Sequence, residues 1–335
     1  MRVKVSAPAS LMLMGEYAVL QGYLALVCAV DKRMTVIMSF REDNIINIES
    51  TALGSYSTRI DDLSVVKPFQ FVLAVLKKYQ TQLKCGLDIL ITANFSTTIG
   101  FGSSSAVTVA TLKALTALLN ISLSPLALLV EGRTIVQAVQ GRGSGADVAA
   151  AVYGGVVGYR MQEMPSTTED CFATLAMTAQ SQCVPYVEII PHTFPLVALY
   201  AGFKTPTADA IKLLQTRFAK KEVELASILN AIGECAEAGF QYAKKANWSA
   251  LGGMMIIQQG LMQDLGVSLP VLDALVQDLC QQPGILGAKI SGSGLGDCVI
   301  GLGEVAPDYQ FQGDDAGVYR IPVAISQLGV QCEQI

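Results

Sequence analysis

A glycine- and serine-rich turn that leads straight into a long helix is the feature that most narrows what this chain can fold into. The segment Thr97–Ala106 (TTIGFGSSSA) runs into Ser103–Leu119, where Ala, Leu and Val predominate and predict a helix. Glycine lets the backbone approach a ligand closely, and the first N–H groups of a helix have no partners within it. The segment therefore predicts a helix N-terminus that can hold a phosphate, within a mixed α/β fold.

The same segment has a simpler interpretation, an ordinary helix capped by glycine and serine. It does not match G-x-x-x-x-G-K-[ST], so a P-loop fold is not indicated. Two more glycine-rich segments follow: Gly141–Asp147 (GRGSGAD) and Gly287–Cys298 (GAKISGSGLGDC), which leads into a strand. Asp147 could bind Mg²⁺, accept a proton or merely cap a helix. A lone G-x-G-x-G turn supports no particular function.

One carboxylate interrupts the apolar N-terminal segment. Glu16 lies within Ser6–Gly22 (SAPASLMLMGEYAVLQG), where a buried carboxylate without a partner would be costly. We therefore expect Glu16 either to contact a substrate or to form a structural salt bridge.

Composition favours a large buried core. The chain has 335 residues, of which 51% are hydrophobic and 15% are charged, against about 25% charged in an average soluble domain. This composition excludes disorder, and the length suffices for two lobes. Polar or charged residues interrupt every long apolar stretch, and the N-terminus lacks the pattern of a signal peptide. We therefore predict a cytoplasmic protein with no membrane partner.

Charge and side-chain counts exclude other chemistries. The net charge is −5 and no basic run is present, so no nucleic-acid partner is expected. His192 is the only histidine, which excludes a histidine-rich zinc site. Acid–base chemistry is therefore expected to fall to Asp, Glu or Lys.

The order of the expected elements favours two packed halves. Strand patterns come first, at Val3–Ser6, Ala25–Ala29, Thr35–Phe40 and Ile45–Glu49, and a helix over 67–79 and a strand over 87–92 follow. After residue 190, a strand at 196–200 leads to four helical segments and a strand at 298–302. No low-complexity linker separates the halves, so a boundary near residue 190 is expected to be a packed hinge.

These four segments, in this order and at these spacings, resemble the GHMP kinases. That superfamily includes galactokinase, homoserine kinase, mevalonate kinase and phosphomevalonate kinase. Its three motifs correspond to Ala7–Gly22, Gly100–Ala106 and Lys289–Cys298, and the resemblance spans essentially the whole chain. Each motif alone is weak evidence for this family, whereas the occurrence of all three in this order is specific to it.

The resemblance implies an α/β (α+β) fold with two lobes. Residues 1–190 would form the ATP-binding lobe with a left-handed βαβ crossover, and residues 191–335 a ferredoxin-like lobe. It also implies ATP and Mg²⁺ as cofactors, with Ser104 as the metal ligand and Asp147 as the catalytic carboxylate. Residues expected to bind ATP are Gly100, Gly102, Ser103, Ser104, Ser105, Gly292, Gly294 and Gly296. Residues expected to bind the substrate are Ser10, Glu16, Ser144, Gly145 and Ser293.

The acceptor substrate is less clearly indicated. Residues 16–26 (EYAVLQGYLAL) and Leu261–Asp273 resemble mevalonate kinases, whereas Gly143–Gly155 and Gly296–Cys298 resemble phosphomevalonate kinases. We expect a phosphotransferase of the mevalonate pathway that acts on the mevalonate hydroxyl, with phosphomevalonate as the alternative acceptor. A non-catalytic paralogue that binds a nucleotide or metabolite is a second alternative. A homodimer is expected only by analogy with the family.

Two positions depart from the family pattern. Ser10 stands where the first motif usually has a lysine that acts on the catalytic aspartate. The Mg²⁺-binding glutamate of the helix before Asp147 is also missing: Val136 takes its place, and Glu131 lies about a turn earlier. We expect Lys204 or Lys289 to supply the missing positive charge, with Lys204 as the catalytic candidate.

Overall fold

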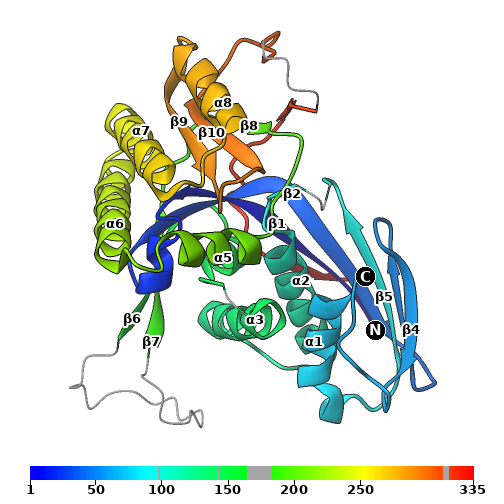
Figure 1. Cartoon of the computed structure of the whole chain (residues 1–335). Coiled ribbons are helices and arrows are strands. Elements are labelled where there is room, and N and C mark those ends of the chain that lie inside the picture. Colours follow the sequence, from blue (N-terminus) through cyan, green and yellow to red (C-terminus); the bar gives the residue numbers. More distant parts are fainter. Residues whose placement is uncertain (97–98, 142, 164–182, 312–316) are drawn as a thin grey trace.

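The computed structural model describes residues 1–96, 99–141, 143–163, 183–311 and 317–335. Thr97 and Thr98 of the first glycine-rich segment, and Arg142 of the second, lie outside the described residues. The described chain contains two sheets with their helices, and the chain runs from the first sheet to the second and back (Figure 1).

The N-terminal lobe is built on a mixed sheet with the order β12-β1-β2-β5-β3-β4, and β6 and β7 extend it beside β2. Its strands are β1 (Arg2–Met14), β2 (Ala25–Phe40), β3 (Ile45–Ser50), β4 (Gly54–Arg59), β5 (Leu87–Ala93), β6 (Val156–Glu163), β7 (Cys183–Ile190) and β12 (Gln331–Gln334). The β3–β5 pair is parallel and is joined through β4 and α1 (Gln70–Lys78). The mixed sheet and this parallel crossover agree with the expected fold class.

The strands β1 and β2 are longer than the sequence patterns predicted. The predicted strand Val3–Ser6 is only the first part of β1, and the two predicted strands in 25–40 form one continuous strand. Val5 belongs to the core under the N-terminal helices, whereas Leu11 and Leu13 belong to a second core. A strand buried by both lobes loses the alternation of polar and apolar residues that marks a half-buried strand.

Helices cover one face of this sheet (Figure 1). They are α1, α2 (Ser103–Leu118), α3 (Pro125–Gln140) and α4 (Ala146–Tyr153), and the short 3₁₀ helix η2 (Gln80–Gln82) follows α1. A second 3₁₀ helix, η1 (Ala18–Gln21), contacts a helix of the second lobe. Ala106, Ala110 and Ala114 of α2 are fully buried, and these small side chains let α2 pack closely on β1 and β2. The predicted helix over 67–79 begins only at Gln70, because a proline at 68 disfavours helical backbone in the residue before it.

The second lobe has a four-stranded antiparallel sheet in the order β11-β8-β10-β9. Its strands are β8 (Leu196–Tyr200), β9 (Ile285–Ser291), β10 (Cys298–Gly303) and β11 (Tyr319–Ile321). Its helices are α5 (Thr207–Arg217), α6 (Glu222–Lys244), α7 (Trp248–Leu265) and α8 (Pro270–Gln281). The helices α7 and α8 pack on β9 (Figure 1). None of the helices in the described ranges is both long and apolar enough to cross a membrane.

The end of the chain returns to the first sheet, which the sequence patterns did not predict. The strand β12 pairs with β1, and Val30 forms an isolated bridge with Ile325. The Arg33 side chain donates to the carbonyls of Leu328 and Gly329 and holds this segment in place. The last residues of the chain therefore pack with the N-terminal lobe. The boundary between the lobes at residue 190, where β7 ends, stays a proposal.

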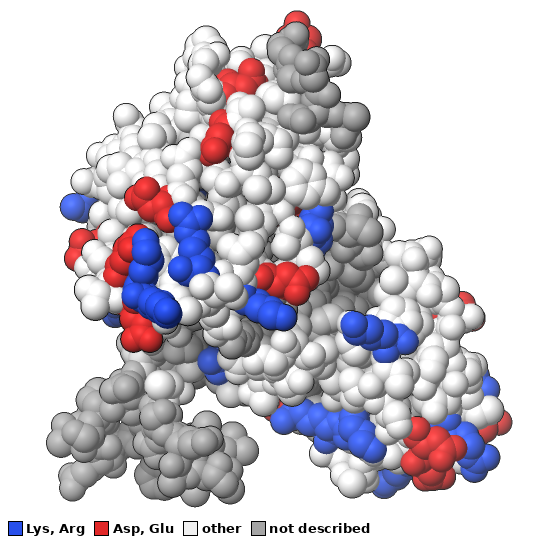
Figure 2. Space-filling view, in the orientation of Figure 1, with Lys and Arg blue, Asp and Glu red and all other residues white. Residues whose placement is uncertain are grey.

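Charged side chains are dispersed over the molecular surface. On the face shown in Figure 2, basic and acidic residues alternate around α5 and α6 and at the far end of the N-terminal lobe. The surface between these regions is mostly uncharged on this face. The prediction that the chain binds no nucleic acid stays a prediction.

Candidate active site

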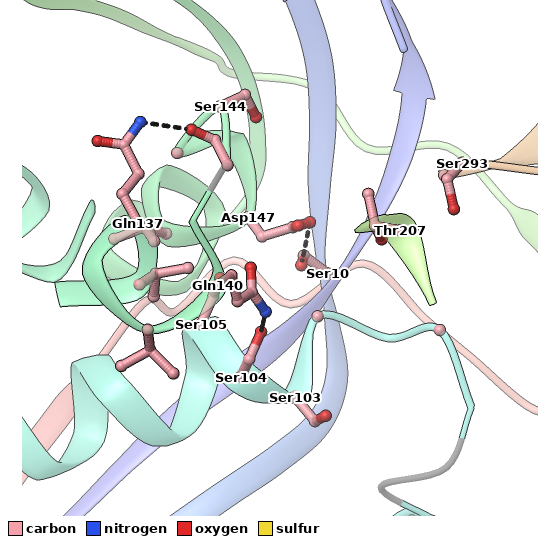
Figure 3. A pocket seen from close by; sticks show the side chains of 18 of the residues that line it. Ser10, Ser103, Ser104, Ser105, Gln137, Gln140, Ser144, Asp147, Thr207 and Ser293 are labelled. Carbon is pink, nitrogen blue, oxygen red and sulfur yellow. Dashed lines mark hydrogen bonds between the residues drawn. The ribbon is translucent and has the colours of Figure 1, made fainter. Parts of the chain in front are cut away.

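A pocket of about 900 Å³ lies where β1 and the starts of α2 and α4 meet two loops of the second lobe. It brings together thirteen of the residues predicted from the sequence: Ser10, Glu16, Gly100, Gly102, Ser103, Ser104, Ser105, Ser144, Gly145, Asp147, Lys204, Gly292 and Ser293. Gly294 and Gly296 do not line it. Figure 3 shows Ser10 and Asp147 facing each other beside the serines of α2, with Thr207 and Ser293 on the other side.

The start of α2 forms one wall of the pocket. Gly102 precedes the helix with a left-handed backbone (φ 62°), and no side chain caps this end. A methyl group on Gly102 would overlap the Ser10 hydroxyl, so only glycine fits between α2 and β1. A helix N-terminus without a side-chain cap, in the wall of a pocket, can accept an anion such as phosphate.

Ser10 and Asp147 form the polar centre of the pocket. Ser10 Oγ, on β1, donates a hydrogen bond of 2.8 Å to Asp147 Oδ1 in the first turn of α4. Burial raises the pKa of Asp147 above its usual value, whereas the Ser10 hydrogen bond and the charge of Lys204 oppose the rise. Ser10 thus contacts Asp147 from the position at which the first motif of the family usually has a lysine.

The structure distinguishes the two lysines that could replace the missing charge. Lys289 is fully buried, and its Nζ lies 2.5 Å from Glu16 Oε1. Lys204 lies on the loop between β8 and α5, lines the pocket and places its Nζ 3.9 Å from Asp297 Oδ2. Lys204 is the lysine whose charge lowers the pKa of Asp147.

Glu16 joins the first motif to the second lobe. Its carboxylate accepts hydrogen bonds from Lys289 Nζ and from Gln258 Nε2 of α7, each at 2.5 Å, and from Gly292 N at 3.3 Å. Burial lowers the pKa of Lys289, and the adjacent Glu16 carboxylate opposes this effect. The sequence left open a substrate contact or a salt bridge for Glu16; the structure contains the salt bridge, and the substrate contact stays a prediction.

The third glycine-rich loop closes one side of the pocket. Gly292, Gly294 and Gly296 all have positive φ, which glycine adopts without strain. The Tyr17 hydroxyl donates to the carbonyl of Ser293 and so ties this loop to the first motif. Gly294 packs on Val267 and Gly296 on Phe203, so these two glycines shape the loop without lining the pocket.

Ser144 and Gly145 shape the turn before Asp147. Gly145 has φ 98°, and a side chain there would overlap the Tyr159 hydroxyl and Arg133. The Ser144 carbonyl accepts hydrogen bonds from Arg133 Nε at 3.0 Å and from the Tyr159 hydroxyl at 2.6 Å. The turn is therefore rigidly held from two sides, which fixes the direction of the Asp147 side chain.

The helix α3 supplies amides in place of the missing glutamate. Glu131 is turned away toward α1, where it accepts from the Tyr79 hydroxyl at 2.8 Å. Val136, Gln137 and Gln140 line the pocket instead, and Gln140 Nε2 donates to Ser104 Oγ at 3.3 Å (Figure 3).

The donor set suits a magnesium ion that keeps most of its water. The described residues contain no group of three or more His, Cys, Asp or Glu side chains placed to hold a metal. Ser104 and Asp147 nevertheless present oxygens to the same pocket. Mg²⁺ in kinases is bound by few protein oxygens together with water and substrate phosphates, so these residues fit that ion.

Several residues of the pocket have no distinctive sequence pattern. Gln137, Gln140 and Thr207 lie on helix surfaces, where no local pattern separates them from solvated polar residues. Asp297 belongs to the third motif but was not singled out. The signal that could have found it is an acidic residue directly before a buried strand, within a run of glycines.

Comparison with known proteins gives matches along the whole chain. The family model described as GHMP kinases N terminal domain matches residues 69–155, and the one described as GHMP kinases C terminal matches residues 240–309. A mevalonate kinase of Thermococcus sibiricus is 29% identical over 361 residues, which cover 100% of this chain and 99% of that protein.

Solved structures share the fold. The mevalonate kinase of Methanococcus jannaschii superposes with a TM-score of 0.73 at 21% identity, covering 96% of this chain and 98% of that chain. Phosphomevalonate kinase of Streptococcus pneumoniae, in complex with phosphomevalonate and AMPPNP, has a TM-score of 0.74 at 17% identity, covering 97% and 100%. With both family models matched in order, full-length relatives and the same two-lobed fold, the chain belongs to the GHMP kinase superfamily.

Proposed function

We propose that this protein is a mevalonate kinase, which transfers the γ-phosphoryl group of ATP to the hydroxyl of mevalonate. The observation that carries the proposal is the meeting, in one pocket, of the uncapped start of α2 with the Ser10–Asp147 pair. Full-length alignment with a protein named mevalonate kinase supports the choice of acceptor. The pocket is also lined by Lys67, Arg133 and Lys204, which can face an acidic substrate.

In the proposed reaction the phosphoryl group passes directly from ATP to the acceptor, and the protein forms no covalent bond to it. The acceptor oxygen forms a bond to the γ-phosphorus, the bond from that phosphorus to the bridging oxygen of ADP breaks, and the hydroxyl proton passes to Asp147. Phosphoryl transfer has a loose transition state, so positioning and charge stabilisation supply most of the catalysis. Backbone N–H groups at the start of α2 would bind the phosphates, and Asp147 would orient the hydroxyl.

Mg²⁺ would be held by Ser104 together with phosphate oxygens, and when bound it supplies positive charge to the transferring group. In the proposed site, the Lys204 ammonium provides a second positive charge beside Asp147. Lys204 belongs to the loop between β8 and α5 and lines the pocket. The Ser10 hydroxyl keeps the Asp147 carboxylate oriented without adding a charge.

Phosphomevalonate is the alternative acceptor, in which a phosphate oxygen replaces the hydroxyl. Two sequence features favour it: the run Gly143–Gly155 around Asp147 and the triplet Gly296–Cys298 at the end of the third loop. Against it, relatives that align over nearly their full length carry the name mevalonate kinase. The third possibility is a protein that binds a nucleotide or metabolite without catalysis. It is favoured by Ser10, which stands where the family motif usually has a lysine.

Release of ADP, measured with purified protein, MgATP and each acceptor in turn, tests these readings. We expect ADP release with mevalonate and little with phosphomevalonate. The reverse preference would establish the alternative acceptor, and no release with either would favour the binding protein. A cytoplasmic location and a homodimer belong to the same proposal and rest on the family analogy.

A further inference from the structure

The loop that carries Lys204 is fastened to the third glycine-rich loop on both sides of the lysine. Ala201 N donates to the carbonyl of Asp297, and Asp297 N donates to the carbonyl of Phe203, both at 2.8 Å. The Thr205 hydroxyl donates at 2.5 Å to another carbonyl of the third loop. The backbone around Lys204 is thus held, while its side chain remains 38% exposed and needs a further contact to fix its ammonium.

Asp297 supplies that contact, although its carboxylate is buried and its backbone is left-handed. It is 8% exposed and has φ 68°, a left-handed backbone that aspartate adopts less readily than glycine. Its carboxylate occupies the space that a side chain on Gly100 would need. Oδ2 lies 3.9 Å from Lys204 Nζ, and Oδ1 is buried without a hydrogen-bond partner.

This arrangement lowers the stability of the fold. Burial raises the pKa of Asp297 to about 6, although the charge of Lys204 and the backbone N–H of Gly100 oppose the rise. Glycine would adopt this backbone without strain, and neither glycine nor asparagine would bring a charge into the pocket wall. Backbone strain and a perturbed carboxylate at the edge of a binding pocket are typical of functional positions.

We propose that Asp297 is a positioning residue that holds the Lys204 ammonium at the Ser10–Asp147 pair. Lys204 is close enough for its charge to act on both Asp147 and Asp297. Asp297 also binds the backbone of the Lys204 loop, so one residue sets both the course of that loop and the direction of its charged side chain. The inference rests on the proposed role of Lys204 in phosphoryl transfer.

Steady-state kinetics of Asp297→Asn test the inference. Asparagine keeps the shape of the side chain and tolerates the left-handed backbone, so the fold should be retained. We expect kcat to fall about tenfold or more, because a stabilising charge at the transferring group is no longer fixed, with KM for ATP unchanged. Asp297→Gly is the second variant, and it should show the same loss with an unchanged or higher melting temperature. Wild-type kcat in both folded variants would overturn the inference.

A double-mutant cycle separates positioning from an independent effect. Lys204→Met should lower kcat by about 10²-fold, and adding Asp297→Asn to it should cause no further loss, because Asp297 acts only through that lysine. Lys212→Met removes an exposed lysine of α5 and is the matched control, with wild-type kcat expected. Losses that multiply in the double variant would contradict the proposal.

Chemical reactivity gives a readout that does not depend on the acceptor. The rate at which an amine-reactive acetylating reagent modifies Lys204, followed by mass spectrometry, should rise in Asp297→Asn, and the rate at Lys212 should not change. An unchanged rate at Lys204 would overturn the inference. If the wild-type protein released no ADP but this difference were present, the proposed function would fail while the positioning by Asp297 would stand.

Discussion

At the scale of single residues, the site depends on a carboxylate whose surroundings differ from the family pattern. Ser10 offers Asp147 a neutral hydrogen bond, and the nearby positive charge comes from Lys204, which follows Asp147 by 57 positions and Ser10 by 194. A carboxylate that is buried and only partly compensated keeps a raised pKa, which suits a late proton acceptor. Asp147 is thus the residue through which the pocket would act on an acceptor hydroxyl.

Replacing Asp147 with asparagine tests this role. Asparagine keeps the size of the side chain and can still interact with Ser10, but it cannot accept the proton. We expect kcat to fall by about 10²–10⁴-fold, while ATP binding, measured by isothermal titration calorimetry, is retained. Near-normal kcat would rule out Asp147 as the catalytic carboxylate.

The raised pKa of Asp297 makes stability depend on pH. The folded pKa of about 6 exceeds the usual value of 3.8 for an aspartate, so the folded state binds the proton more tightly than the unfolded state. The free energy of unfolding should therefore fall as pH rises from 4 through 6, by about 3 kcal/mol at most. Asp297→Asn should be more stable than the wild type at pH 8 and equal to it at pH 4 in urea denaturation. A constant difference across this range would contradict the assigned shift.

At the scale of elements, the ion pair between Glu16 and Lys289 joins the turn after β1 to β9 and, through Gln258, to α7. Both charged groups are almost completely removed from solvent. Such a pair contributes little net stability, yet removing one partner leaves a buried charge without compensation. Its main effect is to hold the first motif against the second lobe beside the pocket.

Lys289→Met alone should therefore destabilise the fold more than the double substitution that removes both charges of the pair. We expect the single variant to lower the free energy of unfolding by about 3–5 kcal/mol. In the double variant Lys289→Met with Glu16→Gln, much of that loss should be recovered. Guanidinium denaturation of the wild type and the two variants measures both values, and a double variant as unstable as the single one would contradict this account.

At the scale of the whole molecule, local patterns predicted the glycine-rich loops and the helices α2 and α3. A turn with positive φ favours glycine, and a buried helix shows a run of apolar residues, so both can be recognised from neighbouring residues alone. The carboxylate at 147 was predicted because it directly follows such a glycine-rich turn. They could not predict contacts made by tertiary packing. The return of β12 to β1, the pairing of Lys289 with Glu16 and the pairing of Lys204 with Asp297 join residues that lie far apart in sequence. The sequence proposed both lysines as the missing cation, and only the fold separates them.

The charge-poor composition is consistent with the way the pocket is built. The wall proposed to bind phosphates consists of backbone and hydroxyl groups from the start of α2, and among the described residues the basic side chains that line the pocket are Lys67, Arg133 and Lys204. A site of this kind does not need a strongly basic protein, because helix N-terminal N–H groups and a metal ion carry the phosphates. A net charge of −5 is therefore compatible with a kinase acting on an acidic substrate.

Phosphorus NMR of the products shows whether the protein phosphorylates the mevalonate hydroxyl. Purified protein is incubated with MgATP and mevalonate, and a parallel sample contains phosphomevalonate. We expect that, with mevalonate, the ATP signals give way to those of ADP and a phosphate monoester, and that the Asp147→Asn protein does not form this product in the same time. A diphosphate formed only with phosphomevalonate, or no product from either acceptor, would contradict it.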